Sequence, residues 1–219
     1  MFHDETVFIR DPLDRQFGTR GRSLVLLNNH RSMSDQPLAT TSSLKVALNG
    51  HAAKMDTDED ILFLYLTSHR SRKFVLSIDR PGLALPDLSA EELAAQLRAI
   101  PVKWKVVVMS ACYSGGFLPL LSAPETLVMT VASSTRTSFG CSDTSDMTYF
   151  GKAYFKESLP QATSFFDAFH KATELVEVWE RVEVSKNEGA KHSEPQIPLG
   201  QLIEAQLEWW WKQPGAVSR

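Results

Sequence analysis

The sequence predicts an α/β fold with a mostly parallel sheet, and two observations support this class. Four apolar runs have the length of buried strands, at residues 24–27, 61–66, 106–109 and 127–132. Such continuous runs are typical of strands that are covered on both faces, as the strands of a parallel sheet are. Helical patterns lie between or after these runs, and this alternation is typical of βαβ units.

Helices are predicted from apolar residues at helical spacing, over residues 41–54, 89–100, 148–159, 164–184 and 199–212. Ser89 and Glu92 have the spacing of a capping box at the start of the second helix, and Pro160 ends the third. The consecutive tryptophans 209–211 cannot all face the core, so we expect at least one to be buried and one or two to be exposed. The polar segment 185–198 is predicted to be a loop.

Length and composition predict one domain over residues 1–219. The chain is 43% hydrophobic and 22% charged, which is ordinary for a globular domain. Its formal net charge of −3 gives no electrostatic reason to bind nucleic acid. No apolar run approaches the roughly 18 residues of a membrane span, and the first residues lack the pattern of a secretory signal. The chain as given is therefore expected in the cytoplasm, or in the periplasm or outside the cell if a leader has been removed.

Polar and reactive side chains follow the predicted strands. Asn28, His69, Cys112 and Ser133 each come at or just after the end of an apolar run. The carboxyl ends of parallel strands lie along one edge of a sheet, and ligands of open α/β sheets bind outside that edge. We therefore expect these side chains to meet in one crevice.

Cys112 is the candidate nucleophile of this crevice. A thiol is a good nucleophile when a base lies near it, and His69 is the candidate base. Gly115 and Gly116 follow the cysteine, and glycines allow a backbone to approach a ligand closely. The amide of Cys112 would be placed at a sharp turn to donate to a developing oxyanion. The alternative is a small buried cysteine and a structural histidine.

Neither a metal nor an organic cofactor is predicted. No cluster of His and Cys has zinc spacing, and the glycines after Cys112 lack the lysine of a phosphate-binding loop. The acidic run 56–60 lacks the glycine and the final glutamate of a calcium loop, so it is expected to be a solvated turn. The two cysteines form one disulfide or none.

Several motifs in order give the chain a resemblance to a known family. The segments Leu64–His69 and Val108–Gly116 look like the histidine and cysteine motifs of caspase-like cysteine peptidases. The chain is most similar to the legumain family, peptidase family C13, in its bacterial branch. Four further segments carry this similarity: Val25–Asn29, Thr137–Asp143, Met147–Gly151 and Glu194–Ile197. The resemblance covers about residues 23–207 and implies a caspase-like three-layer α/β/α sandwich.

The resemblance also implies a catalytic arrangement. Cys112 would attack the scissile carbonyl, and His69 would transfer the proton to the leaving amine. In this family an asparagine at the end of the first strand orients the histidine, and Asn28 is the matching position, with Asn29 beside it as the alternative. The backbone amides of Cys112 and Arg70 would hold the oxyanion.

Substrate recognition is expected, from the same resemblance, at Arg31 and at Ser138 and Phe139 in the loop after the fourth strand. Two positions depart from the family pattern. Arg70 replaces the glycine that follows the histidine, and a positive φ there would cost a non-glycine residue about 1–2 kcal/mol. Ser110 replaces an acidic residue two positions before the nucleophile. With Arg31 nearby, we hypothesise that the pocket accepts an acidic side chain as well as Asn.

The predicted function is that of a cysteine endopeptidase that acts on peptides or proteins, with cleavage after Asn or Asp. The alternatives are a transamidase or peptide ligase, which uses the same residues, and a non-catalytic peptide-binding pseudo-peptidase, which the replacement at Arg70 suggests. Cys141 is predicted to be a free thiol without a catalytic role. The oligomeric state is left open by the sequence.

Overall fold

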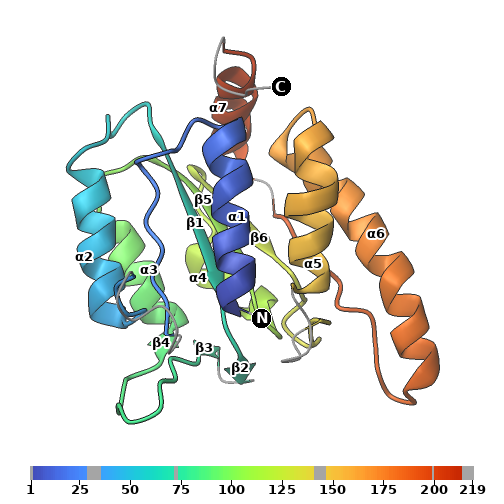
Figure 1. The fold of residues 1–219 in the computed structure, drawn as a ribbon. Helices are drawn as coiled ribbons and strands as arrows, with labels where there is room; N and C mark the ends of the chain where they lie inside the picture. Colours follow the sequence, from blue (N-terminus) through green and yellow to red (C-terminus); the bar gives the residue numbers. More distant parts are fainter. Residues whose placement is uncertain (1, 29–35, 72–73, 141–146, 199, 214–219) are drawn as a thin grey trace.

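The computed structural model describes residues 2–28, 36–71, 74–140, 147–198 and 200–213 (Figure 1). Three residues with predicted roles, Asn29, Arg31 and Cys141, lie outside these ranges. None of the described helices is both long and apolar enough to cross a membrane.

The central sheet holds three described parallel strands in the order β1-β5-β6, which are β1 (Ile61–Thr67), β5 (Trp104–Ser110) and β6 (Thr126–Thr130). These strands confirm three of the four predicted apolar runs. Alternate residues of β5 point to opposite faces, so Val106 and Val108 join one hydrophobic cluster while Val107 and Met109 join another. All four are fully buried, because helices cover both faces of the sheet.

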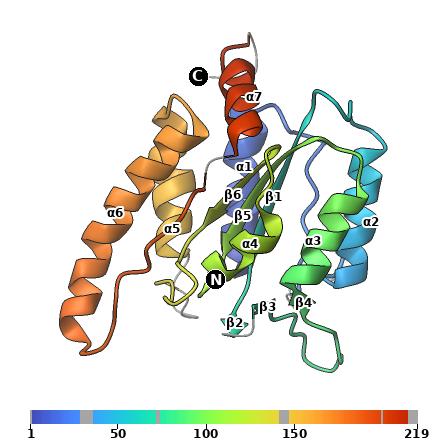
Figure 2. The same ribbon diagram turned by 180° about the vertical axis from the view of Figure 1, so that it is seen from behind.

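The two clusters divide the helices into two layers (Figures 1 and 2). One face is covered by α2 (Thr41–Ala52), α3 (Ala90–Ala99) and α4 (Leu118–Leu121). The other face is covered by α1 (Phe2–Gln16), α5 (Tyr149–Gly151), the π-helix η3 (Lys152–Ser158), α6 (Phe165–Lys186) and α7 (Gln201–Trp211). The fold is therefore an α/β/α sandwich with a parallel central sheet, as predicted.

The helix ends follow their sequence signals. The hydroxyl of Ser89 accepts from the N–H of Glu92 at 3.1 Å, which confirms an N-cap at the start of α3. Pro160 lies in the 3₁₀ turn η4 (Leu159–Gln161), directly after η3. In α7, Trp211 is buried and Trp209 is 52% exposed, so the predicted division of the tryptophans is confirmed.

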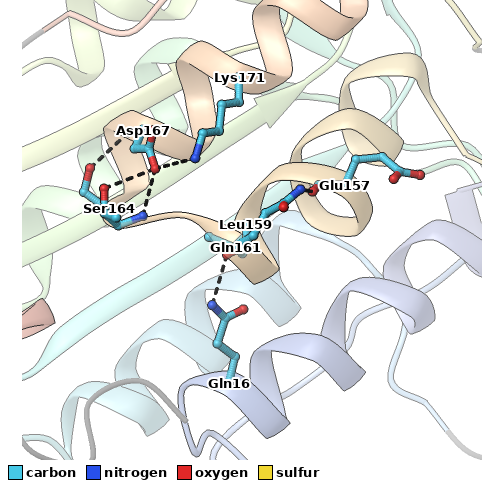
Figure 3. A network of polar contacts seen from close by, with 8 residues as sticks. Gln16, Glu157, Leu159, Gln161, Ser164, Asp167 and Lys171 are labelled. Atoms are coloured by element: carbon cyan, nitrogen blue, oxygen red, sulfur yellow. Dashed lines mark hydrogen bonds and ion pairs between the residues drawn. The ribbon is translucent and has the colours of Figure 1, made fainter. Parts of the chain in front are cut away.

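The start of α6 is capped by its own side chains. Ser164 accepts from the N–H of Asp167, whose carboxylate in turn accepts from Thr163 and Lys171 (Figure 3). Beside this cap, Gln16 at the end of α1 donates to the carbonyl of Leu159 at 3.0 Å. This hydrogen bond attaches α1 to the turn that precedes α6.

One expectation about the first forty residues is wrong, and one helix there was not predicted. The apolar run 24–27 forms no strand, and the N–H of Leu27 donates to the carbonyl of Pro37. The second miss is α1, which no predicted helix covers. Ile9, Leu13 and Phe17 have helical spacing and pack in the core, but Pro12 lies inside the helix and masked this pattern.

A second small sheet also escaped prediction, in which β2 (Arg70–Ser71), β3 (Val75–Leu76) and β4 (Leu88–Ser89) pair antiparallel. These strands have two residues each, so no hydrophobic period could reveal them. Their importance is positional, since β2 begins at the residue after His69.

Candidate active site

His69 and Cys112 follow two neighbouring parallel strands. The register of β1 and β5 pairs Thr67 with Ser110, the last residues of the two strands. His69 and Cys112 each come two residues later, so the fold places them at equivalent positions of one sheet edge. His69 is exposed and Cys112 is half-buried. The register thus places both residues at one edge of the sheet, and their meeting with Asn28 and Ser133 in one crevice stays a prediction.

The turn that carries Cys112 is held by the chain after β6. Tyr113 adopts a left-handed conformation with φ of 57°, which costs a non-glycine residue about 1–2 kcal/mol. Its N–H donates to the carbonyl of Arg136 at 2.7 Å, and the N–H of Gly115 donates to the carbonyl of Ala132 at 2.8 Å. The buried hydroxyl of Ser114 also accepts from the N–H of Ala132. These hydrogen bonds offset the conformational cost at Tyr113 and hold the turn in place.

Gly115 is the glycine that this turn requires. A Cβ on it would lie 2.6 Å from the backbone nitrogen of Ser134 and would overlap the side chain of Gln196. Gln196 belongs to a segment that forms an antiparallel bridge with Thr130 at the end of β6. The predicted loop 185–198 therefore returns to the sheet and packs against the cysteine turn.

Ser138 lies against the sulfur of Cys112. Its backbone N–H donates to Sγ at 3.3 Å, and its hydroxyl oxygen is 3.5 Å from Sγ. The N–H of Ser138 is a donor to the sulfur, and the carbonyl of the same residue, 3.9 Å from Sγ, is an acceptor for the thiol proton, so Ser138 contacts the sulfur as donor and as acceptor.

The backbone at Arg70 shows no need for a glycine. Arg70 lies in β2 opposite Leu76, so it has the extended conformation that any residue adopts. The N–H of Ser77 donates to the carbonyl of His69, which makes Arg70 and Leu76 a non-hydrogen-bonded pair of the antiparallel ladder. The amide of Arg70 therefore points away from β3.

The other predicted site residues have different surroundings. The carboxamide of Asn28 exchanges two hydrogen bonds with the backbone of Ala39, at 2.8 and 3.0 Å, just before α2 begins. Ser110 is 1% exposed at the end of β5. The ring of Phe139 stacks on that of Tyr149, with centroids 6.2 Å apart. Among the predicted recognition residues that the structure describes, Ser138 contacts the sulfur of Cys112 directly.

Sequence reasoning missed an ion pair at the edge of this site. Arg136 donates to the carboxylate of Glu194 at 3.1 Å, and this contact lowers the pKa of Glu194 below its usual value. Glu194 has a φ of 57°, so the segment 193–197 turns sharply here. The Glu194–Ile197 motif was part of the family resemblance, yet its spacing alone did not indicate a partner 58 positions away.

No group of three His, Cys, Asp or Glu side chains that could hold a metal ion occurs among the residues described. A hollow of about 350 Å³, lined by Lys105, Glu125 and other residues, lies where β5 and β6 begin. It is thus at the end of the sheet opposite to Cys112, and the reactive groups are not in it.

The parallel α/β/α sandwich defines an α/β class of protein, in which a cysteine and a histidine follow neighbouring strands at the carboxyl edge of the sheet. The chain matches the model of the Peptidase C13 family over residues 38–205, and it belongs to this family. No curated protein matches the chain closely enough to count as a relative.

Proposed function

We propose that the protein is a cysteine endopeptidase in which Cys112 and His69 form the catalytic dyad. The observation that carries this proposal is their equivalent position beyond the paired ends of β1 and β5. Membership of the Peptidase C13 family supports a cysteine-type hydrolase. The contact of Ser138 with Sγ gives the thiol a donor that a merely buried cysteine would not need.

In the proposed reaction, His69 accepts the thiol proton and the sulfur attacks the peptide carbonyl. The amides of Cys112 and Arg70 donate to the oxyanion. Support for Arg70 is its extended backbone, whose N–H points away from β3. The tetrahedral intermediate collapses to a thioester as His69 donates a proton to the leaving amine. Water, activated by His69, then releases the acid and restores the thiol.

The proposed substrates are peptides with Asn or Asp before the scissile bond. The recognition residues of this proposal are Arg31, Ser110, Ser138 and Phe139. Ser138 has the strongest support, because it lies against Sγ. Asn28 is proposed to orient His69. Its carboxamide has two donors and two acceptor sites, so its bonds with Ala39 leave hydrogen-bonding capacity for a further partner.

The test is the intact mass of the protein after exposure to a peptide electrophile that ends in Asn or Asp. Wild type is expected to gain one adduct, Cys112→Ala none, and His69→Ala an adduct at a much lower rate. Cys141→Ala serves as the matched control for the second thiol and is expected to behave as wild type. Labelling at the rate of a small free thiol, unaffected by His69→Ala, would contradict the dyad and favour the pseudo-peptidase.

A further inference from the structure

Glu5 is a buried carboxyl group outside the proposed catalytic dyad. It lies on α1 with 0% of its surface exposed. Its Oε1 accepts from the hydroxyls of Tyr65, at 2.8 Å, and of Thr148, at 2.7 Å. Burial raises the pKa of this carboxyl group. Burying a carboxyl group costs free energy, so we expect the buried Glu5 to have a role in the protein.

The chain around Thr148 is shaped to receive this carboxyl group. Thr148 caps α5, since its hydroxyl accepts from the N–H of Gly151 at 2.9 Å while donating to Glu5. A Cβ on Gly151 would overlap the Oε1 atom of Glu5. The threonine thus supplies the donor and the glycine supplies the space. Both belong to the Met147–Gly151 motif, for which the sequence indicated no partner.

A short series of contacts leads from Thr148 to the sulfur of Cys112. The next residue, Tyr149, donates its N–H to the carbonyl of Phe139 at 3.1 Å, and the two rings stack. Gly140 packs so closely that a Cβ on it would lie 2.9 Å from the Tyr149 nitrogen. The residue before Phe139 is Ser138, whose N–H donates to Sγ. Residues 138–140 are therefore fixed on one side by Tyr149 and on the other by Cys112.

The helix that supplies Glu5 lies outside the residues that match the family, which begin at residue 38. It is firmly attached, because Ile9 is buried in the core and Gln16 donates to Leu159 at the far end (Figure 3). Attachment of α1 to the sheet thus does not depend on Glu5 alone. The buried carboxyl group adds a polar contact with the chain that holds Ser138.

We propose that Glu5 is a positioning residue for the proposed peptidase. By fixing Thr148 and, through Tyr149, residues 138–140, it holds Ser138 against Cys112, so that productive binding of a peptide depends on α1. This inference rests on the proposed function for its catalytic consequence. Its structural part, that Glu5 orders residues 138–140, stands apart from any activity.

The test compares Glu5→Leu, which removes the acceptor, with Glu5→Gln, which keeps an acceptor oxygen at similar volume. Asp11→Asn is the matched control, because it removes an exposed carboxylate from the same helix. Two rates are measured for each protein, the labelling of Cys112 by the peptide electrophile and its labelling by iodoacetamide. Hydrogen exchange of the amides of Ser138 and Tyr149 is measured beside them.

Glu5→Leu is expected to lower the ratio of peptide labelling to iodoacetamide labelling by about tenfold to a hundredfold, because small misplacements of a reactive group are costly. Exchange at Ser138 and Tyr149 is expected to rise, with β5 unchanged. Glu5→Gln is expected to restore most of the ratio. A folded Glu5→Leu protein with the wild-type ratio, and faster exchange only in α1, would overturn the proposal and leave Glu5 as an anchor for the helix.

Two further cases are covered by the experiment: a variant that does not fold, and a wild type that takes no label. If Glu5→Leu does not fold, Gly151→Ala replaces it, since the added methyl group displaces the same carboxyl group from the other side. If the wild type takes no peptide label, the proposed function fails, and the exchange data alone decide the inference. Faster exchange at Ser138 and Tyr149 in the variant then supports the positioning role, and unchanged exchange overturns it.

Discussion

His69 and Cys112 stand at equivalent places on neighbouring strands, each two residues beyond the pair Thr67–Ser110 that closes the ladder of β1 and β5. Parallel pairing has this consequence because both strands end at one edge of the sheet. The turn after Cys112 and the small sheet after His69 are then fixed separately, by the chain after β6 and by β3.

If these two residues act as one unit, their substitutions will not be additive. Cys112→Ala is expected to abolish turnover of a peptide substrate, and His69→Ala to lower kcat/KM by at least about 10²-fold through the loss of proton transfer. The double variant should be no worse than Cys112→Ala, as for groups that serve one step. His170→Ala, at an exposed histidine of α6, is the control and should be neutral. Steady-state kinetics on one substrate checks all four, and a wild-type kcat/KM in His69→Ala would contradict the dyad.

The backbone of Ser138, rather than its hydroxyl, should be the main support of the Cys112 sulfur. The N–H lies 3.3 Å from Sγ and the hydroxyl 3.5 Å. Ser138→Ala keeps the N–H, so the rate of iodoacetamide labelling should fall by less than about tenfold, the worth of one ordinary hydrogen bond. Ser134→Ala, at an exposed serine of the same segment, is the comparison. A fall of a hundredfold would show that the hydroxyl is the essential group.

Two glycine substitutions should have opposite effects on stability. Gly115→Ala places a methyl group against the backbone, 2.9 Å from the carbonyl carbon of Ser133 and 2.6 Å from the nitrogen of Ser134. We expect the free energy of unfolding to fall by about 1–3 kcal/mol. Gly50→Ala in α2 meets nothing within 4 Å, so it should stabilise the protein by about 0.5–1 kcal/mol. Urea unfolding measures both, and equal effects would contradict the close packing at Gly115.

The buried carboxyl group of Glu5 should make stability depend on pH with a definite sign. Its pKa in the folded protein is raised, chiefly by burial, above the value of about 4.3 of an unfolded chain. The folded state therefore favours the protonated form. Its contribution is fully present below the unfolded pKa and is lost as the pH rises through the folded pKa. Each unit of the shift corresponds to about 1.4 kcal/mol.

Glu5→Gln removes this ionisation. As the pH rises from about 4 to about 8, the unfolding free energy of the Glu5→Gln protein should therefore increase relative to that of the wild type. Urea titrations across this range give the difference between the two curves. Asp11→Asn controls for the loss of one carboxylate from α1. Parallel curves for wild type and Glu5→Gln would contradict the raised pKa.

Three strands and most of the long helices could be predicted from the sequence. The apolar runs of β1, β5 and β6 are continuous because helices cover both faces of the sheet, and burial of this kind leaves a local pattern. The same patterns located His69 and Cys112, because the residue that follows an apolar run is known once the run is known. By contrast, run 24–27 has the composition of a strand but forms none, and Leu27 donates to the carbonyl of Pro37.

The sequence by itself thus determined the class of fold, the strand ends and the two candidate catalytic residues that follow them. Only the tertiary structure decided that Ser138 lies on the sulfur, that Arg70 has a strand conformation, and that Glu5 is bound between β1 and α5. The physical reason is distance along the chain. Glu5 meets Tyr65 across 60 positions and Thr148 across 143, and contacts of such range leave no period or spacing in the sequence, because the packing of whole layers brings them together.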